Sequence, residues 1–285
     1  MNFQEYLHNA WSTHAEDPKK VADELRAAFN LMESGEDVMA MSRLIVHVCG
    51  EHLGEWQRGI ELLRKLKNNA TISDRSEMNR LVAILTLGNN PSVSIENFST
   101  SDQVRIYCAT ASALINLGGV KNSEIFLKKS LDLMESIPAK DDPAYKSIAM
   151  AANNIASVLE EKIEINKREV ELMILAATTG RKFWDIAGNW KEIERAEYHL
   201  AKSFLKAKLP EKAILHAREC LAIVDSNGNE PLEVFFAFEV IALAEGALKN
   251  LAGSKRALEN MQYAFDKLES DDQTLCKKIL EKMQD

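Results

Sequence analysis

The sequence predicts an all-α protein in which antiparallel helix pairs stack on one another. Signals that start and stop helices recur along all 285 residues. Only 12 Gly and 6 Pro interrupt them, and runs of β-branched residues are scarce. In addition, small and apolar residues return at a fixed period in the carboxyl-terminal half, as repeated helix pairs require.

Capping signals divide the chain into individual helices. Asp17-Pro18 and Asp142-Pro143 each place an N-cap residue before a proline in the first helical turn. Gly35, Gly88 and Gly118-Gly119 lie where helices should end. The helices expected on these grounds span residues 2–15, 18–33, 36–53, 55–68, 73–87, 101–117, 120–137, 143–162, 165–186, 190–207, 210–225, 231–250, 253–269 and 272–284.

One long irregular stretch suggests a division of the chain. Residues 89–100 are rich in Asn, Ser and Pro and are predicted to form a loop. We expect residues 1–88 to form an amino-terminal helical region and residues 101–285 to form a repeat array. The last helix, 272–284, carries Leu275, Ile279, Leu280 and Met283 on one side, which is typical of a cap that ends such an array.

The repeat is visible at the positions where two paired helices would cross. The first helix of each pair carries a small residue there, and an apolar residue follows three positions later. The second helix begins with another small residue. The first set is Ala111, Ala156, Ala201 and Glu245 beside Ala244, with offsets of 45, 45 and 44 residues, and the second set is Ser123, Arg168, Ala213 and Ala257.

This pattern resembles the tetratricopeptide repeat, most closely in the stretch Ala196–Phe204 followed by Pro210, Ala213, Ala217 and Leu221. An earlier pair has His52-Leu-Gly-Glu-Trp56 as its turn, and the resemblance covers roughly residues 36–68 and 103–270. It implies a right-handed α-α superhelix, or solenoid, of antiparallel helix pairs that holds a partner in a concave groove. The period of about 44 exceeds the typical 34, and Arg168 and Glu245 depart from the small-residue pattern.

Composition argues against several classes of function. The formal charge of −8 disfavours nucleic-acid binding, which depends on Lys and Arg at phosphates. No uncharged segment reaches the length of a membrane span, and the amino terminus lacks the features of a signal peptide. The four cysteines are widely spaced with no C-x-x-C pair, so we expect buried thiols in a reducing, cytoplasmic location.

Neither a catalytic site nor a metal or cofactor site is expected. The sequence has no G-x-S-x-G, P-loop or G-x-G-x-x-G motif, so we predict that the protein is not an enzyme. His47 and Glu51 share a helical face, with His52 beside them, but the five-residue step from His47 to His52 suits an α-helical ligand pair poorly. His8, His14 and His52 could converge only through tertiary structure.

The first helix of each pair is expected to line the concave surface and to contact a partner. In that register the partner-binding candidates are Arg105, Ser112, Asn153, Asn154, Arg195, Tyr198, Lys202 and Lys249, with Lys206 near the middle. Amide and cationic donors suit the carbonyls of an extended peptide and an acidic tail. Asn154 and Arg195 also match the carboxylate clamp of chaperone-tail-binding tetratricopeptide domains. Cys108 and Ser112 replace its lysine and asparagine, so that clamp is not predicted.

The leading functional hypothesis is an adaptor or scaffold that binds a peptide or helical segment of another protein. The alternative is a regulatory sensor, similar to bacterial helical-repeat regulators that bind a signalling peptide or effector. A self-assembling subunit is a third interpretation, and the oligomeric state stays open.

Overall fold

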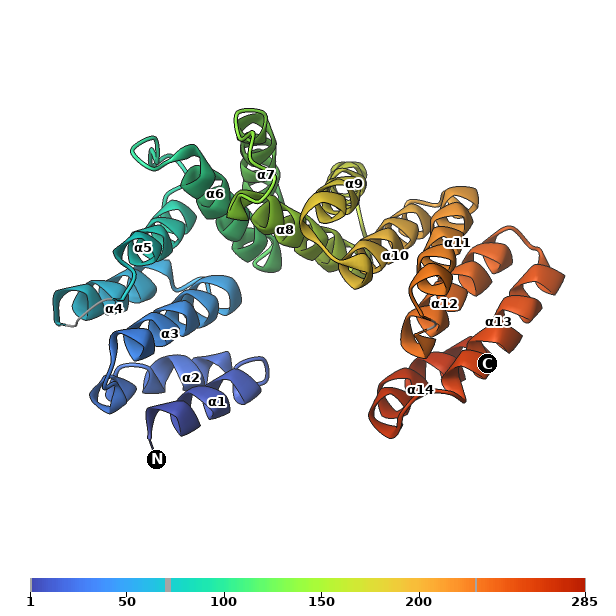
Figure 1. The fold of residues 1–285 in the computed structure, drawn as a ribbon, viewed down its shortest axis with the longest axis horizontal. Coiled ribbons are helices and arrows are strands. Elements are labelled where there is room, and N and C mark those ends of the chain that lie inside the picture. Colours follow the sequence, from blue (N-terminus) through green and yellow to red (C-terminus); the bar gives the residue numbers. More distant parts are fainter. Residues whose placement is uncertain (1, 70–72, 229, 285) are drawn as a thin grey trace. The chain divides into compact units, whose positions relative to one another are not determined.

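The chain folds entirely into helices and loops over the residues that the structure describes, which are 2–69, 73–228 and 230–284. The structure is a computed structural model, and it divides into two compact units, Met1–Ala151 and Ala152–Asp285. Fourteen α-helices follow one another along this part of the chain (Figure 1). The predicted all-α fold of paired helices is confirmed.

The first unit contains seven helices and the beginning of an eighth. They are α1 (Phe3–Thr13), α2 (Pro18–Glu24), α3 (Gly35–Ile45), α4 (Trp56–Asn69), α5 (Arg75–Asn89), α6 (Thr100–Asn116), α7 (Val120–Met134) and α8 (Pro143–Glu161). Two shorter elements differ from the predicted α-helices. A 3₁₀ helix, η1 (Ala27–Leu31), follows α2, and a π-helical segment, η2 (Val46–His52), continues α3.

The second unit contains the rest of α8 and six further helices. They are α9 (Lys167–Ala187), α10 (Trp190–Lys206), α11 (Pro210–Asn227), α12 (Pro231–Ala247), α13 (Leu251–Phe265) and α14 (Ser270–Gln284). Side-chain caps fix several starting points. Asn166 and Asn189 each accept a bond from the backbone N–H three residues later, and the backbone N–H of each cap residue donates to the carboxylate of Glu169 or Glu192.

The division between the two units falls inside α8, after Ala151. The predicted loop at 89–100 lies within the first unit and joins α5 to α6. Ile95 anchors this loop with only 2% of its surface exposed. The loop therefore packs on its own unit while connecting two helices.

Paired helices meet at small residues, as predicted, but the last repeat is shorter than expected. Ser123 Oγ donates to the carbonyl of Ala111 at 2.9 Å, and Ser254 Oγ donates to the carbonyl of Ala242 at 3.0 Å. The slot equivalent to Ala201 is thus Ala242, 41 residues later, and Glu245 does not occupy it. Arg168 is exposed near the start of α9.

The turns between paired helices show the same register. The amide of Gly119 donates to Leu114 O, that of Leu209 to Phe204 O, and that of Asn250 to Glu245 O. The residue preceding each donor adopts a left-handed conformation. These residues are Gly118 (φ 77°), Lys208 (φ 61°) and Lys249 (φ 60°). The last of these turns is not expected at this position, because Leu248-Lys-Asn250 contains neither Gly nor Pro to signal a helix end.

Two glycines make room for the indole of Trp56 in the first unit. An ideal β-carbon on Gly88 of α5 would lie 2.5 Å from Trp56 Cζ3, and one on Gly50 of η2 would lie 3.1 Å from the same atom. The contact at Gly88 is too close for a residue with a side chain, and the one at Gly50 is tighter than most β-carbon contacts. The start of α4 therefore packs against both α5 and the π-helical segment.

The last helix buries most of the predicted side, since Leu280 is buried and Ile279 and Met283 pack beside it. Cys276 and Leu280 of α14 are buried against Phe235 and Met261, whereas Leu275 is 62% exposed. Along the described residues, no helix has an apolar stretch long enough to traverse a bilayer.

Candidate functional site

The predicted partner-binding residues fall in both units. Arg105 and Ser112 lie on α6 in the first unit. Arg105 is half-buried, with its Nη1 3.4 Å from Asp102 Oδ1, and Ser112 is only 7% exposed. Ser112 therefore faces the packed interior of the repeat and not a groove, because its position on α6 is covered.

The other six candidates belong to the second unit. Asn153 is half-buried on α8, and its Oδ1 is enclosed without a hydrogen-bond partner among the described residues. Asn154 beside it is exposed. Arg195, Tyr198 and Lys202 lie on α10, whereas Lys249 is exposed in the turn beyond the end of α12. Lys249 thus departs from its expected place on the helix.

Arg195 is already paired with a carboxylate of the neighbouring repeat. Its Nε and Nη2 donate to Glu233 Oε1 on α12 at 3.1 and 2.9 Å. Glu233 is buried, while the Arg195 side chain keeps 58% of its surface exposed. The guanidinium predicted to receive a partner's carboxylate therefore first stabilises the contact between α10 and α12.

A second carboxylate lies beside this ion pair. Glu194 is 1% exposed, and its Oε1 has no hydrogen-bond partner in the part of the chain that the structure describes. Burial, assisted by the charge of Glu233, raises the pKa of Glu194 to about 8. Glu194 is therefore a proton-binding group in the interior of the second unit near neutral pH.

Tyr198 links α10 to α12 through its hydroxyl group, which donates to Glu239 Oε2 at 3.0 Å. Burial raises the pKa of Tyr198, and burial also raises the pKa of Glu239, although the bond from Tyr198 acts in the opposite direction. Lys202 Nζ lies 5.4 Å from the centre of the Tyr198 ring, close enough for a cation–π contact.

Next to Tyr198 the structure has a cavity of about 390 Å³, which we call the α10–α12 groove. Leu205, Val240 and Leu243 give it an apolar floor, and Leu243 is 42% exposed. The charged side chains that line it are Lys202, Lys206, Lys208, Glu160 and Glu239. Of these five residues, the sequence predicts Lys202 and Lys206 as part of a partner-binding surface.

Both carboxylates of the α10–α12 groove are hydrogen-bonded to neighbouring side chains. Glu160 Oε2 contacts His199 Nδ1 at 3.0 Å, and Glu160 Oε1 accepts from Ser203 Oγ at 2.7 Å. Glu239 accepts from Tyr198. Lys206 Nζ donates to the carbonyl oxygen of Lys162, a neutral partner. The groove therefore presents lysine charge above an apolar floor.

A separate cluster of histidines lies in the first unit. His14 is the C-cap residue of α1, and His47 and His52 belong to η2. The ring centroid of His14 lies 4.8 Å from that of His47 and 5.0 Å from that of His52, and the rings of His47 and His52 are 4.7 Å apart. His8 is exposed on α1 and does not belong to this histidine cluster.

The five-residue step between His47 and His52 does not separate the two rings, because the segment is π-helical. The amide of Leu53 donates to Val48 O at 3.2 Å, five residues earlier. His52 Nε2 consequently lies 3.1 Å from His47 Nε2. Burial lowers the pKa of His52, and the neighbouring His47 and His14 lower it further. The α-helical spacing assumed from the sequence is wrong at this point.

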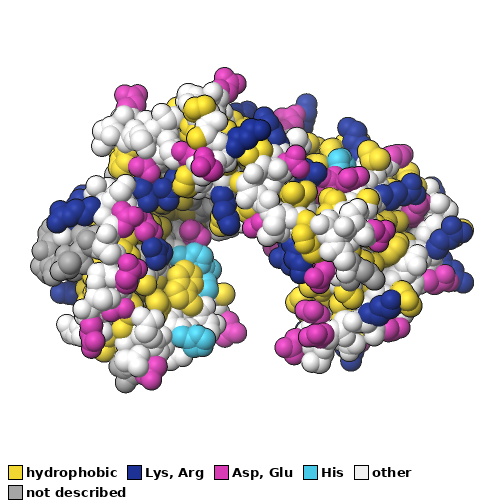
Figure 2. All heavy atoms as spheres, viewed as in Figure 1, with side chains coloured by type: hydrophobic (Ala, Val, Ile, Leu, Met, Phe, Trp, Pro, Cys, Tyr) yellow, Lys and Arg dark blue, Asp and Glu magenta, His cyan; other side chains and the backbone are white. Residues whose placement is uncertain are grey.

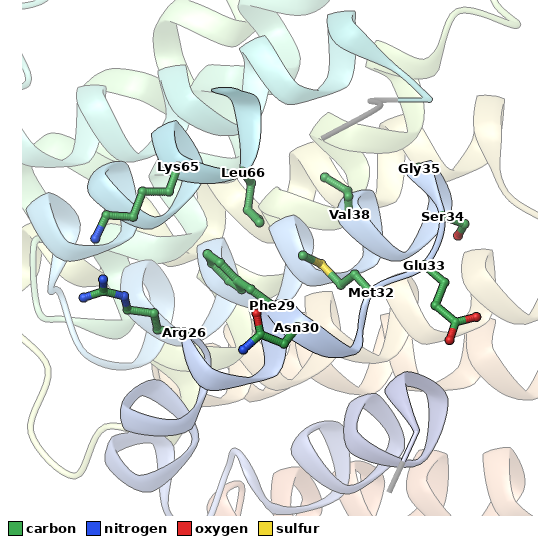
Figure 3. Close-up of a pocket in the computed structure, with 10 residues that line it drawn as sticks. All are labelled: Arg26, Phe29, Asn30, Met32, Glu33, Ser34, Gly35, Val38, Lys65 and Leu66. Atoms are coloured by element: carbon green, nitrogen blue, oxygen red, sulfur yellow. The ribbon is translucent and has the colours of Figure 1, made fainter. Parts of the chain in front are cut away.

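Another pocket, of about 580 Å³, lies in the first unit between η1, α3 and α4. Phe29, Met32, Val38 and Leu66 supply its apolar surface, and Glu33 extends from the opposite end to Arg26 and Lys65 (Figure 3). None of the predicted partner-binding residues lines it. Arg26 and Lys65 lie at one end of the pocket and Glu33 lies at the other, so the charged groups do not form a reactive centre.

Comparisons with known proteins support the fold. No protein-family model matches the chain, and no curated protein matches its sequence. A crystal structure of nearly identical TPR-like repeats from Podosopora anserina, described as those of a "putative kinesin light chain", superposes with a TM-score of 0.52 and 11% identity. The match covers 82% of this chain and 97% of that one. The chain therefore has a TPR-like helical-repeat fold.

Proposed function

We propose that the protein is a non-catalytic adaptor whose α10–α12 groove binds an acidic segment of a partner protein that also carries apolar residues. The fold supports this proposal in general terms, because TPR-like repeats are commonly protein-interaction scaffolds. The single observation that carries it is the grouping of Lys202, Lys206 and Lys208 around an apolar floor. The four buried free thiols fit a reducing, cytoplasmic location.

Charge complementarity selects the kind of occupant. Within the described part of the chain, none of the three lysines forms an ion pair with a carboxylate. Lys206 donates to a backbone carbonyl, and Lys202 lies over the ring of Tyr198. A partner's Asp or Glu can therefore approach them without displacing an internal pair. Glu160 and Glu239 repel such a partner less than exposed acids would, because their oxygens accept bonds from neighbouring side chains.

The apolar floor supplies the second half of the recognition. Leu243 is 42% exposed beside Val240 and Leu205. Burying exposed apolar area contributes about 25 cal/mol per Å², so a leucine or phenylalanine of the partner placed there adds affinity that charge alone does not give. The expected occupant is thus a peptide with acidic residues flanking an apolar one.

A peptide-display selection on the full chain tests this proposal. The wild type should enrich acidic peptides with an apolar residue, and their affinity should fall as salt is raised. The variant K202E/K206E/K208E should bind the selected peptides at least about tenfold more weakly. K121E/K255E/K278E reverses three exposed lysines that do not line the groove and serves as the matched control.

Two results would contradict the proposal. One is selection of peptides without acidic residues, and the other is equal binding by the groove variant and the control. The alternative hypothesis of a regulatory sensor predicts that the selection yields a narrower range of peptides, in which one short signalling peptide binds far more tightly than all related acidic sequences.

A further inference from the structure

We propose that His14, His47 and His52 together bind one Zn²⁺ ion through imidazole nitrogens. One ligand atom from each residue lies within 4.8 Å of the other two. A tetrahedral zinc site has Zn–N distances of about 2.0–2.1 Å, which places ligand nitrogens about 3.4 Å apart. The Nε2 atoms of His47 and His52 are already 3.1 Å apart, so only the His14 nitrogen, which lies within 4.8 Å of the other two ligand atoms, has to move closer.

The outer contacts of two rings direct the correct nitrogen at this centre. His14 Nδ1 lies 2.6 Å from the carbonyl oxygen of Trp11. A carbonyl can only accept, so Nδ1 carries the hydrogen and Nε2 keeps its lone pair. In the same way, His47 Nδ1 lies 2.8 Å from Glu51 Oε2. Protein zinc sites repeatedly show this arrangement, in which the second ring nitrogen is held by a carbonyl or a carboxylate.

The backbone that presents His47 and His52 is itself unusual. Residues 46–52 form a π-helical segment, a conformation that is rare and often found at functional sites. The segment turns His52 toward His47, and the C-cap of α1 brings His14 to the same point. Zinc would thus join two segments of the first unit that are distant in sequence.

The proposed site is open to solvent. All three histidines are half-buried, and histidine side chains are visible at the surface of the first unit (Figure 2). Three imidazoles select zinc and its transition-metal neighbours over Mg²⁺ and Ca²⁺, which prefer oxygen ligands. Three protein ligands also leave the fourth position of a tetrahedral ion to water or to an atom from another molecule.

Titration of the untagged full chain with ZnCl₂ alone, by calorimetry and by competition with a chelator, tests the proposal. One ion should bind per chain with a dissociation constant in the micromolar range or below. His14→Gln, His47→Gln and His52→Gln should each weaken binding at least about tenfold, and Glu51→Gln should weaken it by about 10- to 100-fold. His8→Gln removes an exposed histidine outside the cluster and should leave binding unchanged.

A second readout separates loss of ligands from loss of fold. Zn²⁺ should raise the thermal midpoint of the wild type and of His8→Gln, and it should leave the midpoint of the cluster variants unchanged. All variants should melt like the wild type in the presence of a chelator. The proposal is overturned if the dissociation constant of the wild type for Zn²⁺ exceeds about 100 μM, which corresponds to a binding free energy of roughly 5.5 kcal/mol. It is also overturned if the cluster variants bind Zn²⁺ as tightly as the wild type does.

Discussion

The side-chain oxygen of Asn153 lies where a side chain on residue 180 would begin. An ideal β-carbon built on Gly180 of α9 would stand 2.0 Å from Asn153 Oδ1 and 3.1 Å from Asn153 Cγ. The close approach of α8 to α9 in the second unit therefore requires a glycine at this position, although glycine is unfavourable in a helix interior.

Gly180→Ala should lower the free energy of unfolding by about 1 kcal/mol, because overpacking outweighs the gain in helix propensity. Urea denaturation measures the change. Gly246→Ala is the matched control, since a β-carbon there would meet only Ser254 Oγ at 3.8 Å, and it should stabilise by up to about 1 kcal/mol. Adding Asn153→Ala should restore the stability that Gly180→Ala removes. A double variant that is no more stable than Gly180→Ala alone would argue against this explanation.

Glu194 should make the stability of the protein depend on pH. Its pKa is raised to about 8 by burial, so between about pH 4.5 and 8 the folded chain holds a proton that the unfolded chain releases. The free energy of unfolding contributed by this group therefore falls as pH rises through that window. Glu194→Gln should match the wild type near pH 5 and exceed it by about 2–4 kcal/mol at pH 8.

Denaturation at both pH values measures this difference. Because the wild type and Glu194→Gln share every other titrating group, the difference between their free energies of unfolding gives the contribution of Glu194. A difference that stays constant between pH 5 and pH 8 would rule out the buried, protonated carboxyl.

Arg195→Ala should destabilise the second unit by about 1–2 kcal/mol, because Glu233 would stay buried without its guanidinium partner. Arg195→Lys should recover only part of the loss, since a single ammonium cannot reproduce two donors in one plane. Thermal denaturation of both variants checks this. An Arg195→Ala protein as stable as the wild type would show that the arginine is free for a partner, as the sequence suggested.

Lys208 should show opposing effects on stability and on binding. It adopts φ 61°, where Gly118 stands in the equivalent turn of the first unit. Lys208→Gly should raise the free energy of unfolding by about 1 kcal/mol and weaken binding of acidic peptides in the α10–α12 groove. Lys249→Gly relieves the same conformation at φ 60° outside that groove, so it should stabilise without a change in binding.

Much of the fold could be predicted from capping residues and from small residues at crossings. Asp17-Pro18 and Asn189 begin helices for local reasons that need no tertiary information. The length of the last repeat could not be predicted in this way, because the turn at Lys249 forces a left-handed conformation on a residue that gives no such signal.

The candidate sites could be predicted less completely. Lys202 was found because it lies on a first helix, but its neighbour Glu239 comes from the next repeat, and only the crossing of α10 and α12 brings the two together. Ser112 faces the interior because α6 is covered on that side. The histidine cluster could not be predicted, since α-helical periodicity sets residues five apart about 140° apart around the axis.

The π-helical hydrogen bonding of residues 46–52 and the placement of the histidine rings are coupled. The i→i+5 bonds turn His47 and His52 to the same side. A ligand that holds the two rings together therefore stabilises the π-helical form over the α-helical form by the same free energy. Hydrogen exchange at the Leu53 amide, which is bonded to Val48 O, would slow when the rings are held. A backbone group with no part in the cluster thereby reports on its occupancy.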